Sequence, residues 1–137
     1  QPAVPLAEGE GQWCLALPDD LDGVQVMRCS RWDPTGDGSE LWPPSAADGR
    51  IPDSNTDRAS RSGEQASAAI AVKFTLAPGA SREIPLVISW DLPVTAFASG
   101  SSALRRYTDF FGSSGNNAAA IAAEAYSSVA GCWDLPW

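Results

Sequence analysis

The sequence IPLVISWDLPVTAFASGSSALRRYTDFFG, residues 84–112, is the most ordered part of this chain and decides its fold class. Apolar side chains recur at every second position from Ile84 to Trp90, which is the period of a half-buried strand. Pro93 ends the strand, because it has no backbone N–H to donate and forces Leu92 into an extended conformation. We therefore expect a strand with one strongly apolar face and Trp90 in the core.

A packed corner and a helix are expected after this strand. Arg105 and Arg106 stand directly before the aromatic-rich sequence YTDFFG. Residues 118–129 are almost entirely good helix formers, and Gly131 is suited to a helix C-terminus. The apolar stripe of this helix is shallow and made of small side chains, which predicts close packing against a neighbour. The stripe consists of Ile121, Ala122, Ala125 and Val129.

The part of the chain before this stretch shows further strands and a long loop. Alternating apolar residues predict strands near residues 13–17, 24–28 and 70–76, and the first two of these could pair. Residues 30–65 are rich in proline, glycine, serine and aspartate without a lasting period, which predicts a loop. The Pro-Gly-Ala turn at 78–80 either closes a three-residue hairpin or crosses between two sheets of a sandwich.

Several segments occur in an order that is not generic. They are ELW at 40–42, ADGRI at 47–51, LAPG at 76–79, ISWDLP at 88–93, RRYTDFFG at 105–112 and the Ala-rich sequence at 118–125. In this order they resemble the N-terminal domain of glycoside hydrolase family 116, the bile-acid β-glucosidase or non-lysosomal glucosylceramidase family. The resemblance covers roughly the last two thirds of the chain, within the usual size of one domain. It departs at Ala98, where the family pattern has glycine, and at the end of the chain, where the family continues through more helix.

The resemblance and the strand periods together predict a mainly β fold, a β-sandwich followed by one C-terminal α-helix. Residues 1–112 would form part of the sandwich, with the long loop at about 30–65. Residues 113–137 would form a linker helix leading toward a catalytic domain that is absent from this chain. The start at Gln1 without a methionine, and the absence of a signal-peptide pattern, also indicate an excerpt from a longer protein.

The resemblance further implies what the whole protein does. It implies a retaining enzyme that hydrolyses β-glucosides, with glucosylceramide as a further candidate substrate. The implied partner of this chain is a helical-toroid catalytic domain of the same protein. A non-lysosomal enzyme with three cysteines in no disulfide pattern points to the cytoplasm.

Composition excludes several other classes. A net charge of -8 repels nucleic acid and anionic membranes, and no run approaches the roughly 18 apolar residues of a transmembrane helix. The chain has no histidine, which removes histidine-based nucleophile systems and the HExxH metal site. The aspartates at 33 and 37 lack the spacing of a calcium loop, so we expect no metal and no cofactor.

Three functions remain open. The first is a non-catalytic domain that packs against and positions the catalytic domain. The second is an independent carbohydrate-binding β-sandwich module, for which Trp32 and Trp42 in the loop are the best candidates for stacking on sugar rings. The third is a self-sufficient glycosidase with two carboxylates, but the sequence singles out no pair and we assign no catalytic residue. Asp91 is interpreted as a cap of the turn before Pro93, and Asp109 as an ion-pair partner of Arg105 or Arg106.

The first function predicts a docking surface on this chain. Apolar side chains on the C-terminal helix, and arginines able to bind facing carboxylates, would form it. The candidates are Arg105, Arg106, Tyr107, Ile121 and Ala125, with Val129 and the apolar end at Cys132, Trp133, Leu135 and Trp137.

Overall fold

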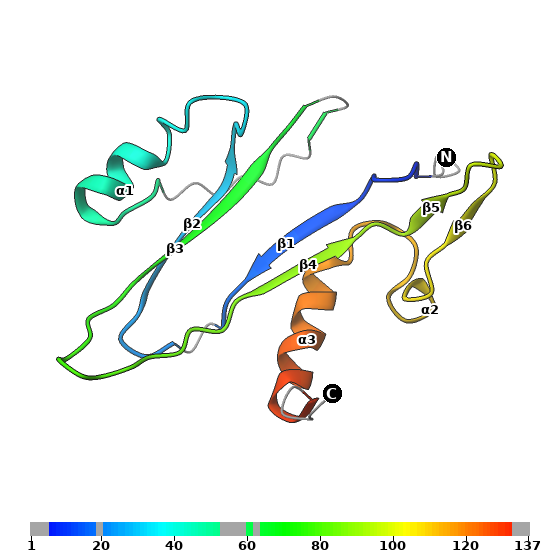
Figure 1. Cartoon of the computed structure of the whole chain (residues 1–137). Helices are drawn as coiled ribbons and strands as arrows, with labels where there is room; N and C mark the ends of the chain where they lie inside the picture. The colour runs from blue at the N-terminus through cyan, green and yellow to red at the C-terminus, as the bar shows by residue number, and fades with distance from the viewer. Residues whose placement is uncertain (1–5, 19–20, 53–59, 62–63, 133–137) are drawn as a thin grey trace. The chain divides into compact units, whose positions relative to one another are not determined.

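The computed structural model describes residues 6–18, 21–52, 60–61 and 64–132, with side chains in the last helix as far as Ser128 (Figure 1). The elements are β1 Gln12–Ala16, β2 Gln25–Trp32, α1 Trp42–Asp48, β3 Ser67–Lys73, β4 Val87–Asp91, β5 Val94–Ala96, β6 Ser102–Leu104, α2 Thr108–Phe111 and α3 Ala118–Cys132. Most of them are strands in small antiparallel sheets, which confirms a mainly β fold with a C-terminal helix. The chain divides into two compact units, and each is described by itself.

The first unit consists of Gln1–Pro18 and Pro85–Trp137, and its centre is the antiparallel pair β1–β4. Trp13 lies opposite Trp90, and Leu15 lies opposite Ile88. Helix α3 packs against both strands, as Figure 1 also shows. The first turns of α3 are the tightest part of this contact, because Ala118 and Ala122 are almost completely buried.

The apolar side of β4 is the exposed side, so the prediction that Trp90 lies in the core is wrong. Ile88 is 55% exposed and Trp90 is 52% exposed, whereas Ser89 and Asp91 are 5% and 0% exposed. The physical reason lies in the start of α3, whose backbone groups need hydrogen-bond partners when they are buried. Ser89 donates its hydroxyl to the Ala118 carbonyl oxygen at 2.7 Å. Small and polar side chains therefore face the helix.

A short hairpin, β5–β6, follows β4 and was not predicted from the sequence. Its strands are joined by a tight turn in which the Phe97 N–H donates to the Ser101 carbonyl oxygen at 2.9 Å. The Arg105 N–H then donates to the Pro93 carbonyl oxygen at 2.8 Å, which returns the chain to the end of β4. The one-turn helix α2 follows, but it buries none of its own residues and Phe110 is 79% exposed, so the aromatic sequence of α2 is not the packed corner that was predicted.

The second unit, Asp19–Ile84, is built on the antiparallel pair β2–β3. Met27 and Cys29 are the buried side chains of β2, and the strand contains an irregularity between Cys29 and Trp32. The strand β3 ends at Lys73, so Phe74 and Leu76 lie beyond it and are exposed.

The loop predicted at about 30–65 contains one short helix. Two prolines follow Trp42 in the first turn of α1, where a missing N–H costs nothing. The helix ends at Gly49, which has a left-handed φ of 73° and donates its N–H to the Ser45 carbonyl oxygen. Between β2 and β3, the described part of the loop contains no helix or strand longer than α1, which agrees with the prediction that this region lacks long regular structure.

The Pro-Gly-Ala turn connects two different sheets. The Ala80 N–H donates to the Ala77 carbonyl oxygen at 3.0 Å, so a tight turn is present. However, β3 pairs with β2, and β4 pairs with β1. The hairpin alternative is therefore wrong and the turn leads from one sheet to another, and the suggested pairing of the first two strands is also wrong. Among the described residues, no helix has the length and apolar character needed to cross a membrane.

Candidate functional site

The carboxylate of Asp91 connects β4, the α2 corner and the start of α3. It is 0% exposed. One oxygen accepts a hydrogen bond from the Tyr107 hydroxyl at 2.8 Å, and the other accepts from the Asn117 N–H at 2.8 Å and the Asn117 side-chain amide at 2.9 Å. A buried carboxylate that accepts three hydrogen bonds is well satisfied. Asp91 thus stabilises the N-terminus of α3, and its interpretation as a cap of the turn before Pro93 is wrong.

Tyr107 is a donor in this cluster over the whole physiological pH range. Burial, the hydrogen bond to Asp91 and the negative charge of Asp91 raise the pKa of Tyr107 to about 12. The phenol therefore keeps its proton and donates a hydrogen bond to Asp91. Gln12 adds a further contact to the same helix start, since its side-chain oxygen accepts from the Ala118 N–H at 3.1 Å.

The arginine corner has a different geometry from the one expected. Arg105 and Arg106 are exposed, and Asp109 lies in the first turn of α2. Neither arginine is within ion-pair distance of Asp109 among the contacts that the structure describes. The predicted ion pair is therefore wrong, and the two guanidinium groups remain available at the surface of this unit.

An apolar patch covers the side of the β1–β4 sheet opposite α3. We call it the aromatic face; it consists of Trp13, Leu86, Ile88 and Trp90. These side chains are 64%, 53%, 55% and 52% exposed. The indole rings of Trp13 and Trp90 contact each other across the strands, with centroids 5.5 Å apart and planes at 42°. Large apolar side chains gathered on one side of a sheet indicate an interaction surface.

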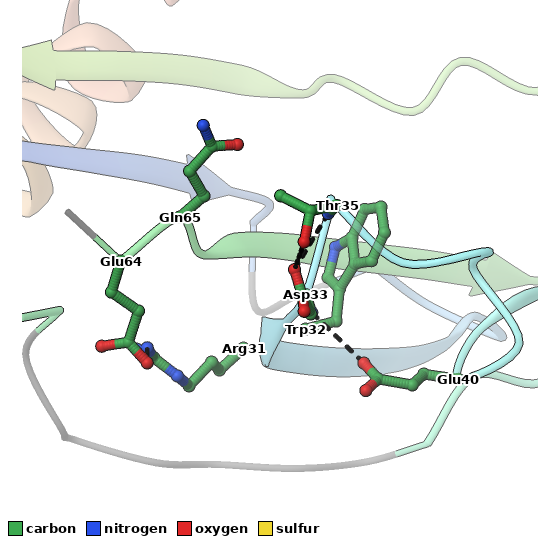
Figure 2. A pocket seen from close by; sticks show the side chains of 7 residues that line it. All are labelled: Arg31, Trp32, Asp33, Thr35, Glu40, Glu64 and Gln65. Atoms are coloured by element: carbon green, nitrogen blue, oxygen red, sulfur yellow. Dashed lines mark hydrogen bonds and ion pairs between the residues drawn. The ribbon is translucent and has the colours of Figure 1, made fainter.

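A pocket of about 460 Å³ lies in the second unit, where β2 ends (Figure 2). We call it the Trp32 pocket. Its walls come from the end of β2, from the turn that follows it and from the two residues just before Ala66. The lining side chains are Arg31, Trp32, Asp33, Thr35, Glu40, Glu64 and Gln65.

Hydrogen bonds and an ion pair fix most of the polar side chains of the Trp32 pocket. Arg31 contacts the carboxylate of Glu64 at 2.5 Å, and the two side chains meet at one side of the pocket in Figure 2. Asp33 accepts from the hydroxyl of Thr35 at 2.7 Å and from its N–H at 2.9 Å. Both bonds lower the pKa of Asp33, so its carboxylate is ionised at neutral pH. Glu40 accepts from the Asp33 N–H at 3.3 Å.

The two tryptophans proposed for sugar stacking lie in different settings. Trp32 is half-buried and lines the pocket, and its indole nitrogen is buried without a hydrogen-bond partner among the described residues. Trp42 lies at the start of α1 and is 67% exposed. It is not among the described residues that line the pocket. The structure therefore does not bring the two candidates together.

The comparison with known protein families identifies the family of this chain. A family model described as beta-glucosidase 2, glycosyl-hydrolase family 116 N-term, matches residues 2–131. The chain belongs to this family. It is the N-terminal domain type of a glycoside hydrolase, and the match extends well beyond the segments quoted from the sequence.

The Asp91 cluster gives the resemblance to family 116 a physical basis. The sequence ISWDLP supplies Asp91, RRYTDFFG supplies Tyr107, and the start of the Ala-rich helix follows Asn117. These three segments are separated in the chain and meet at one buried carboxylate. Each of the three segments therefore contributes a residue to the same buried cluster.

The interface candidates of this family 116 domain are partly used inside their own unit. Tyr107 donates to Asp91, while Ile121 and Ala125 are half-buried on α3, which packs against β1 and β4. Arg105 and Arg106 are exposed. The side chains of Val129, Cys132, Trp133, Leu135 and Trp137 lie outside the described part of the chain.

Two features were missed by sequence reasoning. The aromatic face was missed because alternation identifies the apolar side of a strand but does not say whether anything covers that side. The Trp32 pocket was missed because its lining comes from residues 31–40 and from 64–65, which are joined only by the pairing of β2 with β3. No spacing rule connects these two stretches.

Proposed function

We propose that this chain is a non-catalytic N-terminal domain of a family 116 β-glucosidase or glucosylceramidase. In this role it packs against the catalytic domain and positions it. The family description supports the place of the domain in a larger glycoside hydrolase. In this proposal, residues 1–112 form part of a β-sandwich and residues 113–137 form a linker helix. The linker leads toward a helical-toroid catalytic domain, which is the partner. The substrate is then a β-glucoside such as glucosylceramide, and the enzyme works in the cytoplasm.

The observation that carries the docking role is the aromatic face. Its four apolar side chains are each more than half exposed, while α3 already occupies the opposite side of the same sheet. Burying one large apolar side chain fully contributes about 1.5–3 kcal/mol. The four side chains of this face can therefore contribute substantially to the free energy of association. The exposed Arg105 and Arg106 are suited to the polar rim, where they would bind carboxylates of the partner.

The state of the carboxylates supports a non-catalytic chain. A retaining glycosidase needs one carboxylic acid with a raised pKa and one free carboxylate, about 5 Å apart. Asp91 is occupied by three donors, and hydrogen bonds from Thr35 lower the pKa of Asp33. Glu64 is paired with Arg31 and also accepts from the Arg61 N–H at 2.9 Å. These three acids are held in structural roles.

An activity assay tests the non-catalytic part of the proposal. The purified chain is incubated with an aryl β-glucoside, alongside a family 116 enzyme that contains both domains. We expect turnover from the two-domain enzyme and only background hydrolysis from this chain. Turnover by this chain that persists through repurification and disappears in Glu40→Gln or Glu64→Gln would contradict the proposal.

A mixing experiment tests the docking part. The chain and a separately produced family 116 catalytic domain are applied together to a size-exclusion column with light scattering. We expect one peak with the mass of a complex, because burial of the aromatic face against the partner favours association. A monomer that elutes unchanged beside the catalytic domain would contradict docking.

A further inference from the structure

The Trp32 pocket combines an aromatic ring with closely spaced polar groups, and the proposed docking role does not use it. We propose that this pocket binds a neutral, hydroxyl-rich ligand the size of one sugar ring. Its volume of about 460 Å³ lies within the range of small-molecule sites. Its lining residues all belong to the second unit, whereas the aromatic face belongs to the first.

The charges in the pocket select against an anion. Three carboxylates, those of Asp33, Glu40 and Glu64, line it together with one guanidinium, that of Arg31. The guanidinium is already paired with Glu64 at 2.5 Å. An anionic ligand would therefore meet an excess of negative charge from the described residues that line the pocket.

The geometry of the acids also disfavours a metal ion as the ligand. Metal sites require several ligands that converge on one point. Among the described residues, no three carboxylate or thiol side chains gather closely enough to hold an ion. Asp33 is turned toward Thr35, and Glu64 toward Arg31.

A ring bearing hydroxyl groups matches the remaining groups. Carboxylates that are already oriented by one hydrogen bond keep lone pairs that accept from hydroxyl donors, and Gln65 offers both a donor and an acceptor. The indole of Trp32 supplies an apolar surface for the C–H groups of such a ring. Its N–H is buried without a partner among the described residues, so the ring face and not the N–H is offered to the ligand.

The test is a titration with methyl β-D-glucopyranoside, followed by the indole N–H resonances in two-dimensional NMR of the ¹⁵N-labelled chain. The Trp32 resonance is assigned as the one missing from Trp32→Phe. We expect this resonance to shift and to saturate with a dissociation constant of about 1 mM, as suits a ligand of this size. In Glu40→Gln the dissociation constant should rise about tenfold, because a charged hydrogen-bond acceptor is lost.

A matched control and two other titrants complete the test. Glu83→Gln removes an exposed carboxylate from the same unit outside the pocket, and should leave the dissociation constant unchanged. Absence of a shift at about 100 mM glucoside, far above the expected dissociation constant, would overturn the proposal. So would a shift that Glu40→Gln does not weaken, or saturation by calcium or phosphate that excludes the glucoside. None of these results bears on docking, which is tested on the other unit.

Discussion

Asp91 shows how a single residue organises the first unit. Its carboxylate is fully buried and accepts from Tyr107 and twice from Asn117. Removing one donor leaves a buried charge with less compensation, which is costlier than losing a bond at the surface. The stability of the unit should therefore depend more on Tyr107 than on any exposed polar side chain.

Tyr107→Phe should lower the free energy of unfolding by about 1–3 kcal/mol, because one hydrogen bond to the charged Asp91 is lost. Urea denaturation followed by circular dichroism measures the change. Tyr126→Phe is the control, since Tyr126 donates to the uncharged Ala16 carbonyl oxygen at 2.7 Å. Its loss should be smaller, about 0.5–1.5 kcal/mol. Equal losses for the two variants would contradict the role given to the Asp91 charge.

The pKa of Tyr107 predicts a pH dependence at the alkaline end. The pKa is raised from 10.0 to about 12 in the folded chain, so the folded state holds the phenolic proton more tightly than the unfolded state. This contribution to stability is complete below about pH 10 and is lost as the pH rises through about 12. Only two tyrosines are present, and burial also raises the pKa of Tyr126.

Ultraviolet absorbance of the phenolate measures this titration directly. We expect less phenolate at pH 10 in the folded chain than in denaturant, where both tyrosines titrate near 10, and a separate step near pH 12 from Tyr107. In Tyr107→Phe, the step near pH 12 should disappear and the Tyr126 step should remain. Ordinary titration of both tyrosines in the folded chain would contradict the buried hydrogen bond to Asp91.

At the scale of the elements, the sequence predicted where strands and the long helix lie but not which sides are buried. The period-2 pattern correctly indicated β1, β2, β3 and β4, and the composition of residues 118–129 correctly indicated α3. The pattern placed Trp90 inside because apolar faces are usually buried. Helix α3 instead packs on the side of Ser89 and Asp91, since its first turn needs polar partners there.

The pairing of β1 with β4 depends on a glycine at its edge. A Cβ atom at Gly11 would overlap the backbone carbonyl of Asp91, whereas one at Gly9 would meet nothing. Gly11→Ala should therefore cost at least the roughly 1–3 kcal/mol of an overpacked site. Gly9 has a φ of 83°, so Gly9→Ala reports the cost of a left-handed conformation alone, about 1 kcal/mol.

Thermal or urea unfolding of the two glycine variants compares these costs. The measurement should show Gly11→Ala as clearly less stable than Gly9→Ala, with loss of the β1–β4 contact in amide exchange. If both variants unfold at the same denaturant concentration, the close approach of β1 to the end of β4 is not a determinant of the fold.

For the whole molecule, family membership was predictable because its motifs are local in the sequence. ISWDLP, RRYTDFFG and the Ala-rich helix could be read directly, and the family match over residues 2–131 confirms that reading. The Trp32 pocket could not be predicted, because Glu64 reaches Arg31 only through the pairing of β2 with β3. Helix α1 was also missed, since its two prolines are typical of loops except in a first helical turn.

Calorimetric titration of a family 116 catalytic domain with this chain measures whether the aromatic face docks on that domain. The variant is Trp90→Ser, and the control is Phe97→Ser in the β5–β6 turn, because these two side chains are 52% and 53% exposed. Circular dichroism of each variant verifies its fold.

We expect the unchanged chain to bind, Phe97→Ser to bind equally well, and Trp90→Ser to bind at least about thirtyfold more weakly, as for a central aromatic residue of an interface. No heat of binding with the unchanged chain, or equal dissociation constants for Trp90→Ser and Phe97→Ser, would contradict docking through the aromatic face.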